Sequence, residues 1–177
     1  MSLDVTASVA PIRHKLLRPA RPAPAGPLVR LAAWLTVAGS LAYVGQKLYM
    51  ASRGEVGMPG HPASAQVQAQ FEHPGLAQAG NATLGLVAAL VAWATIAAWG
   101  ARVPRWALLC ALFPAAVTES LGAALIVQRA ALDLEHLDWY PCYETLSGSI
   151  AIASWLTVAL SYTLRSRPWR VQLSAHG

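Results

Sequence analysis

Three ionisable side chains stand inside or at the ends of apolar segments, where a charge has little access to water. Glu119 lies within the stretch LFPAAVTESLGAALIV, nine residues before Gln128. Lys47 is near the end of one apolar segment, and Glu144 is near the start of another. An ionisable group in a bilayer costs on the order of a few kcal/mol, so it should face protein or water and mark a functional site.

These residue types suit acid–base chemistry at a lipophilic molecule. Glu119 is the candidate general acid. Lys47 and Glu144 would orient a substrate or stabilise charge, and either glutamate would be the counter-charge of Lys47. We therefore predict Glu119, Glu144 and Lys47 as catalytic residues. Polar side chains near them are predicted to bind the ligand, on helical faces or at helix starts: Tyr43, Asn81, Tyr143 and Ser147.

Four apolar segments must position these residues. The 177-residue chain is 55% hydrophobic and only 12% charged, well below the charged fraction of a soluble domain. Each segment has about the 20 residues needed to cross a bilayer as a helix. We predict an all-α polytopic membrane protein, a four-helix bundle within residues 28–166, with transmembrane helices at residues 28–50, 80–100, 106–128 and 143–164.

The distribution of Lys and Arg predicts the orientation of the bundle. Ten of the 13 fall in the N-terminal region, the second connection and the C-terminal region, and three fall on the other side. The positive-inside rule then places both termini in the cytoplasm, in a multi-pass protein of the plasma membrane. Residues 1–27 are predicted to be a disordered basic tail, and residues 167–177 a second cytoplasmic tail.

The connection at residues 51–79 is expected to be a structured outer loop. Gly54, Gly57, Pro59, Gly60 and Pro62 favour a defined series of turns. A short amphipathic helix carrying Val67 and Phe71 is expected after them. Together with the second outer loop, this segment would cover an outward-facing polar cleft.

Metal binding has little support. Met58, His61 and His136 are weak candidates on the predicted outer side, but they have no standard ligand spacing. We therefore predict no metal and no cofactor. Nucleotide-binding glycine loops, HExxH and GxSxG are absent from the sequence, which gives no support to nucleotide-driven pumps or the common hydrolases. The basic tail is interpreted as a topogenic signal, and nucleic acid is not an expected partner.

The first functional hypothesis is a membrane protein whose cleft binds a small lipophilic molecule and acts on it as an intramembrane acid–base enzyme. A non-catalytic membrane subunit or assembly factor is the second, with polar residues that bind a partner subunit. The third is an oligomeric carrier of a small solute or protons, for which four helices per chain are few. The bilayer is an expected partner in all three, and a homo-oligomer is compatible with each.

Overall fold

The computed structural model describes residues 19, 21–132 and 139–167 of the chain. Its four long helices are α2 (Pro27–Arg53), α4 (Pro74–Ala94), α5 (Arg105–Leu132) and α6 (Trp139–Arg165). All four are long and apolar enough to cross a membrane, which confirms the predicted all-helical architecture with four candidate spans. Most of the two predicted tails and residues 133–138 lie outside the described residues.

Proline marks the start of the first two long helices, and glycine marks the end of α2. Pro27 and Pro74 occupy the first turns of α2 and α4, where a missing N–H costs no helical hydrogen bond. Gly54 ends α2 with a φ of 65°, and its N–H donates to Ala51 while that of Glu55 donates to Met50. α4 begins and ends six residues earlier than the 80–100 expected from hydropathy. Asn81 therefore lies inside this helix and not at its start.

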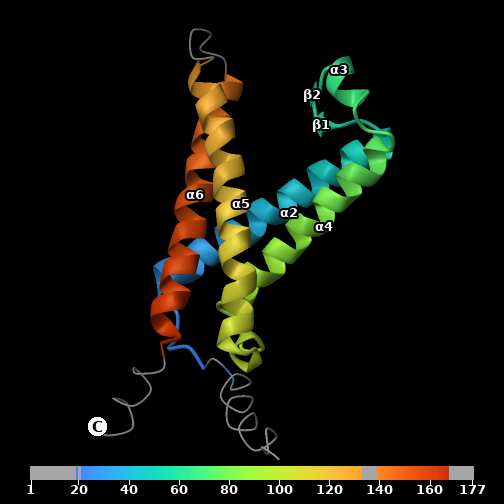
Figure 1. Cartoon of the computed structure of the whole chain (residues 1–177). Coiled ribbons are helices and arrows are strands. Elements are labelled where there is room, and N and C mark those ends of the chain that lie inside the picture. The colour runs from blue at the N-terminus through green and yellow to red at the C-terminus, as the bar shows by residue number, and fades with distance from the viewer. Residues whose placement is uncertain (1–18, 20, 133–138, 168–177) are drawn as a thin grey trace, which may run out of the picture.

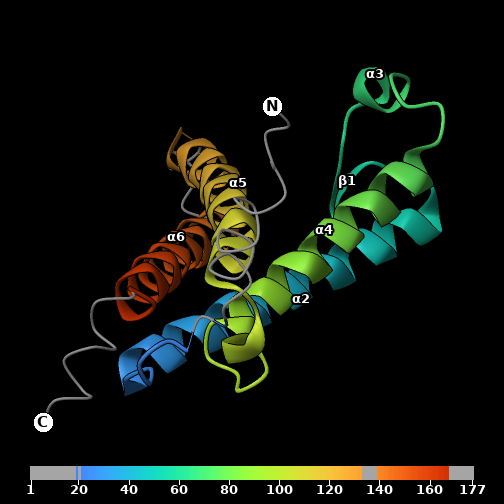
Figure 2. The same cartoon turned by 60° about the horizontal axis from the view of Figure 1, so that its bottom comes forward.

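The helices form two antiparallel hairpins that diverge from one another. α2 packs along α4, and α5 packs along α6, as Figures 1 and 2 show from two directions. We call the end where the hairpins meet the closed end; it contains Pro27, Ala94, Arg105 and Arg165. The opposite end, with Arg53 and Leu132, is the open end. Residues 19, 21–26 and 166–167 also lie at the closed end.

Two glycines allow the helices of each hairpin to approach closely. A Cβ atom on Gly85 of α4 would lie 2.9 Å from a ring carbon of Tyr43 on α2. On Gly148 of α6 it would lie 2.6 Å from a methyl carbon of Val127 and 3.2 Å from the backbone oxygen of Ala123 on α5. Small residues at such contacts are typical of helix packing in membranes.

The shared core of the two hairpins lies toward the closed end. Trp155, Val158 and Tyr162 of α6 are buried there with Leu108 and Leu112 of α5. Alanine and valine side chains of α2 and α4 complete this core: Ala32, Ala33, Val37, Ala88, Ala89, Val91, Ala92 and Ala94. Many large apolar side chains lie instead on the outside of the helices, as expected of surfaces in contact with lipid.

Arg165 connects three segments at the closed end. Its Nη1 donates to the backbone oxygen of Ala23 at 2.7 Å, and its Nη2 donates to that of Thr95 at 3.1 Å. Its Nε donates to Ser161 one turn earlier in α6, at 3.0 Å. The Ala23 N–H also donates to the Arg165 backbone oxygen. Arg165 therefore holds the segment before α2 and the α4–α5 connection against the end of α6.

Candidate functional site

Lys47 uses its ammonium group to fix the loop that follows α2. Its Nζ donates to the backbone oxygen of Gly57 at 2.9 Å and lies 5.2 Å from the ring centre of Tyr43. Gln78 of α4, which is almost fully buried, donates to the same Gly57 oxygen at 3.3 Å. One loop carbonyl therefore joins α2, α4 and the loop.

That loop contains a two-residue β-hairpin. β1 (Gly57–Met58) pairs antiparallel with β2 (His61–Pro62), with Met58 opposite His61. Pro59 and Gly60 form the turn, and Gly60 has a φ of 80°, a left-handed conformation that favours glycine. The Ala63 N–H donates to the Val56 oxygen at 2.8 Å, which extends the pairing beyond the hairpin.

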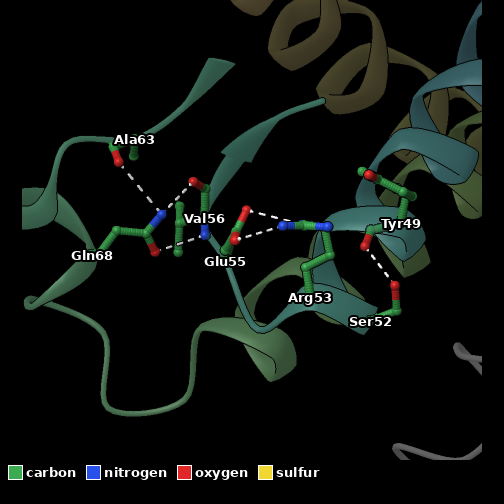
Figure 3. Close-up of polar contacts among 7 residues, drawn as sticks. All are labelled: Tyr49, Ser52, Arg53, Glu55, Val56, Ala63 and Gln68. Atoms are coloured by element: carbon green, nitrogen blue, oxygen red, sulfur yellow. Dashed lines mark hydrogen bonds and ion pairs between the residues drawn. The ribbon is translucent and has the colours of Figure 1, made fainter. Parts of the chain in front are cut away.

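The side chain of Gln68 holds the rest of this connection in place. It belongs to α3 (Ala65–Gln68), a four-residue helix that ends before Phe71. Gln68 accepts a hydrogen bond from the Val56 N–H at 2.8 Å and donates one to the Val56 oxygen at 2.9 Å (Figure 3). The amide of Gln68 thus pairs with the Val56 backbone as a neighbouring β-strand would.

An open pocket of about 320 Å³ lies where α2 meets the hairpin. Arg53 and Glu55 form an ion pair there, with two N···O distances of 3.3 Å (Figure 3). The pocket residues come from the last turn of α2 and from the loop: Tyr49, Met50, Arg53, Glu55, Met58, Gly60 and Pro62. This pocket contains none of the predicted catalytic residues.

Glu119 lies at the middle of α5 and is partly buried. Its carboxyl group makes no hydrogen bond or ion pair with any residue that the structure describes. It is close enough to the Tyr43 phenol for an electrostatic interaction between the two groups. Tyr43 belongs to α2 and Glu119 to α5, so this interaction connects the two hairpins. We call this region the fork.

Ser120, the residue after Glu119 on α5, also has a side chain that lacks a hydrogen-bond partner among the described residues. Its hydroxyl oxygen is buried and has no hydrogen-bond partner in the described part of the chain. Unpaired polar atoms in an apolar environment are costly. The sequence TES at residues 118–120 therefore carries two polar groups whose partners are not supplied by the described residues.

The predicted ion pairs of Lys47 with Glu119 or Glu144 are not formed. Among the described residues, Arg53 forms an ion pair with Glu55, and a carboxyl oxygen of Glu72 lies 4.0 Å from a ring nitrogen of His73. The reason is geometric. α2 and α6 diverge toward the open end (Figure 1), and the Lys47 ammonium is directed at the Gly57 carbonyl. The Lys47 ammonium group lies over the Tyr43 ring, and Tyr43 is in turn near Glu119.

The other predicted site residues are spread over two hairpins. Glu144 and Ser147 are partly buried in the first turns of α6, where the Ser147 hydroxyl donates to the Glu144 backbone oxygen at 3.3 Å. Tyr143 is exposed on the same helix, and Asn81 is partly buried in α4. The structure therefore brings Lys47 and Tyr43 together, with Glu119 near Tyr43, but it does not gather all seven residues at one site.

The weak metal candidates are not gathered into a site. Within residues 19, 21–132 and 139–167, no group of three or more His, Cys, Asp or Glu side chains is placed to hold a metal ion. Met58 lines the pocket next to the β-hairpin. His136 lies outside the described residues, as does the side chain of His61.

Sequence reasoning missed Gln78, Gln68 and the Arg53–Glu55 pair. Glutamine inside an apolar helix was a usable signal for Gln78, because a buried amide needs hydrogen-bond partners. No comparable signal identified Gln68, whose partner is backbone. Comparison with known proteins adds no family: no family model, no curated protein and no solved structure matches this chain.

Proposed function

We propose that this chain is a membrane protein that binds a small lipophilic molecule at the fork and acts on it by acid–base chemistry through Glu119. The observation that carries the proposal is the Glu119 carboxyl in the middle of α5, with no hydrogen bond or ion pair among the described residues. A carboxyl group inside an apolar helix without a partner is costly unless a ligand, water or another chain provides one.

The neighbours of Glu119 support a ligand with a polar head and an apolar body. Tyr43 interacts electrostatically with Glu119, and Lys47 lies over the Tyr43 ring at 5.2 Å. Lys47 and Tyr43 lie on one face of α2, and Glu119 of α5 is near Tyr43. The apolar side chains of Val117 and Leu121 are exposed on the opposite side of α5.

In this proposal Glu119 is the general acid, and Tyr43 donates a hydrogen bond to the ligand. Lys47 positions Tyr43 and stabilises negative charge that develops nearby. Three further residues lie nearer the open end, in the first turns of α6: Tyr143, Glu144 and Ser147. Asn81 lies on α4. In this proposal these four residues contact the apolar part of the ligand or the entrance from the open end to the fork. The open end faces away from the cytoplasm, in the plasma membrane, in accordance with the Lys and Arg distribution.

The test compares molecules that co-purify with the wild-type protein and with Glu119→Gln. Glu119→Gln keeps the shape and hydrogen bonding of the side chain but removes the acid. We expect a lipophilic compound in organic extracts of the wild-type protein, analysed by mass spectrometry. Glu119→Gln should retain the unreacted compound, while Glu119→Ala should lose it. Glu72→Gln is the control, because this exposed glutamate lies outside the fork.

Identical extracts from the wild type and Glu119→Ala would contradict ligand binding at the fork. The orientation has a separate test in a background in which the exposed Cys110 and Cys142 are replaced by alanine. Gln66→Cys and Arg167→Cys are exposed sites near opposite ends of the bundle. An impermeant thiol reagent should label Gln66→Cys but not Arg167→Cys in intact cells, and the reverse pattern would contradict the orientation.

A second candidate function is a non-catalytic subunit whose partner helix covers α5. Its support is one exposed apolar face along α5, formed by Phe113, Val117, Leu121 and Leu125. Glu119 lies on the opposite side of α5 from this face, so it would not contact that partner. Cross-linking from Leu121→Cys to another protein, retained in Glu119→Ala, would favour this function over the enzyme. An oligomeric carrier would instead show Glu119-dependent uptake of protons or a solute into vesicles.

A further inference from the structure

The pocket beside the β-hairpin has the features of a site for a zwitterionic headgroup. It combines one guanidinium, one carboxylate and one aromatic ring with the apolar side chains of Met50, Met58 and Pro62. Its volume of about 320 Å³ is at the small end of the range for ligand sites. We propose that this pocket binds a membrane phospholipid whose headgroup carries both a phosphate and a primary ammonium, as phosphatidylethanolamine does.

Arg53 supplies the phosphate-binding group. A planar guanidinium can donate two parallel hydrogen bonds to phosphate oxygens, which a lysine cannot. The Arg53 guanidinium lies 5.9 Å from the ring centre of Tyr49, which restricts where it can lie. Its present partner is Glu55 at 3.3 Å, and both side chains are substantially exposed. An exposed ion pair of this kind contributes little stability, so it opens readily for a ligand.

Glu55 supplies the ammonium-binding group. When Arg53 binds the phosphate, the Glu55 carboxylate loses its present partner. It can then accept hydrogen bonds from the ammonium group of the ligand, which two carbons separate from the phosphate. The Tyr49 ring offers a further surface to a cation. A choline headgroup has no N–H to donate, and a glycerol headgroup has no cation. The pair of charges therefore selects a primary ammonium over both.

The position of the pocket favours a lipid over a soluble phosphate ester. Arg53 is the last residue of a helix long and apolar enough to span a membrane, so the pocket lies at headgroup level. Ala42, Gly45 and Tyr49 are exposed along one face of α2 that leads away from the pocket. An acyl chain attached to the bound headgroup would lie along this face.

The test measures lipid retention by the full-length protein after delipidation in detergent. Native mass spectrometry would follow titration with phosphatidylethanolamine, phosphatidylcholine and phosphatidylglycerol of identical acyl chains. We expect the wild type to retain the ethanolamine lipid about tenfold better than the other two. Arg53→Gln should lower the retention of all three lipids. Glu55→Gln should remove only the advantage of the ethanolamine lipid.

Matched controls separate this pocket from general charge effects. Arg129→Gln and Glu72→Gln remove the same charges at exposed positions outside the pocket, and both should keep the wild-type order of lipids. Circular dichroism would show whether Arg53→Gln is folded; if it is not, Glu55→Gln, which keeps the side-chain shape, carries the test alone.

Three results would overturn the proposal. The first is equal retention of the three lipids by the wild type. The second is the loss of the ethanolamine preference in Glu72→Gln. The third is competition by soluble phosphoethanolamine at the same concentration as the lipid, which would identify a soluble ligand. None of these readouts depends on Glu119, so the proposal for the fork is unaffected by them.

Discussion

The Lys47 ammonium group donates a 2.9 Å hydrogen bond to the backbone oxygen of Gly57. Lys47 belongs to α2, which is long enough to span a membrane, and Gly57 belongs to the loop that follows it. Gln78 donates to the same oxygen at 3.3 Å from the neighbouring helix. The loop after α2 is therefore anchored to both helices of its hairpin. Lys47 also lies over the Tyr43 ring, so the same cation connects the loop with the fork.

Lys47→Met should loosen this anchor. The substitution keeps most of the aliphatic length but removes the charged donor, which leaves only Gln78 on the Gly57 oxygen. We expect the free energy of unfolding in detergent to fall by about 1.5–3 kcal/mol, the usual value of a hydrogen bond to a charged group. Arg30→Met, at an exposed position near the other end of α2, is the control and should change it little.

Lys47→Met combined with Gln78→Leu tests whether the two donors act together. Because both share one acceptor, their effects should not add, and the interaction energy should be on the order of 0.5–2 kcal/mol. Strict additivity in the double-mutant cycle would show that the shared carbonyl is unimportant for stability.

Gly85→Ala should disturb the contact between α2 and α4. The new Cβ would lie 2.9 Å from a ring carbon of Tyr43 and 3.0 Å from a methyl carbon of Val44. We expect a loss of about 1–3 kcal/mol in the free energy of unfolding, as for overpacked cores. Gly80→Ala on the same helix meets nothing within 4 Å and should instead be neutral or stabilising by about 0.5–1 kcal/mol. Equal effects of the two substitutions, measured by thermal unfolding, would contradict this packing.

Gln68→Ala should release the connection between α2 and α4 without unfolding the bundle. It removes both hydrogen bonds to Val56, at 2.8 and 2.9 Å, and these have no counterpart within the long helices. We expect faster cleavage between residues 54 and 73 in limited proteolysis, at an unchanged midpoint of thermal unfolding. Gln66→Ala in the same short helix is the matched control, since its side chain is exposed. The expectation fails if both variants are cleaved at the same rate.

Arg165→Lys should destabilise the closed end although the charge is kept. The guanidinium donates through three nitrogens to Ala23, Thr95 and Ser161. A single ammonium nitrogen cannot reach all three acceptors. We expect the free energy of unfolding to fall by about 1–3 kcal/mol. Arg167→Lys, two residues further on and exposed, should have no measurable effect, and a similar fall there would contradict the role of Arg165.

The number and type of the long helices could be predicted, because a run of about 20 apolar residues has few alternatives to a membrane helix. The bounds of α4 could not be predicted from hydropathy. Ile96, Ala97, Ala98 and Trp99 are apolar but lie beyond the helix, in the connection to α5. Pro74 at the start of α4 was the better signal, since proline fits the first helical turn.

The candidate site was only partly predictable for a different reason. The spacing of Tyr43 and Lys47 places them on one helical face, and the structure brings them together. The approach of Tyr43 to Glu119 depends on how the two hairpins cross, which hydropathy does not specify. The partner of Lys47 is a backbone carbonyl that exists only after the loop has folded. Side-chain types alone therefore predicted Glu119 or Glu144 as the partner of Lys47 and could not predict the Gly57 carbonyl.

The confinement of the shared core to the closed end has a mechanical consequence. A 27-residue helix is about 40 Å long, so a rotation of about 5° between the hairpins at the core moves their far ends apart by about 3 Å. Trp155, Leu112 and Ala33 belong to this core, so a rotation between the hairpins would have its pivot there. We expect a change in the thickness or lateral pressure of a surrounding bilayer to rotate the hairpins in this way and to change the separation of Tyr43 from Glu119.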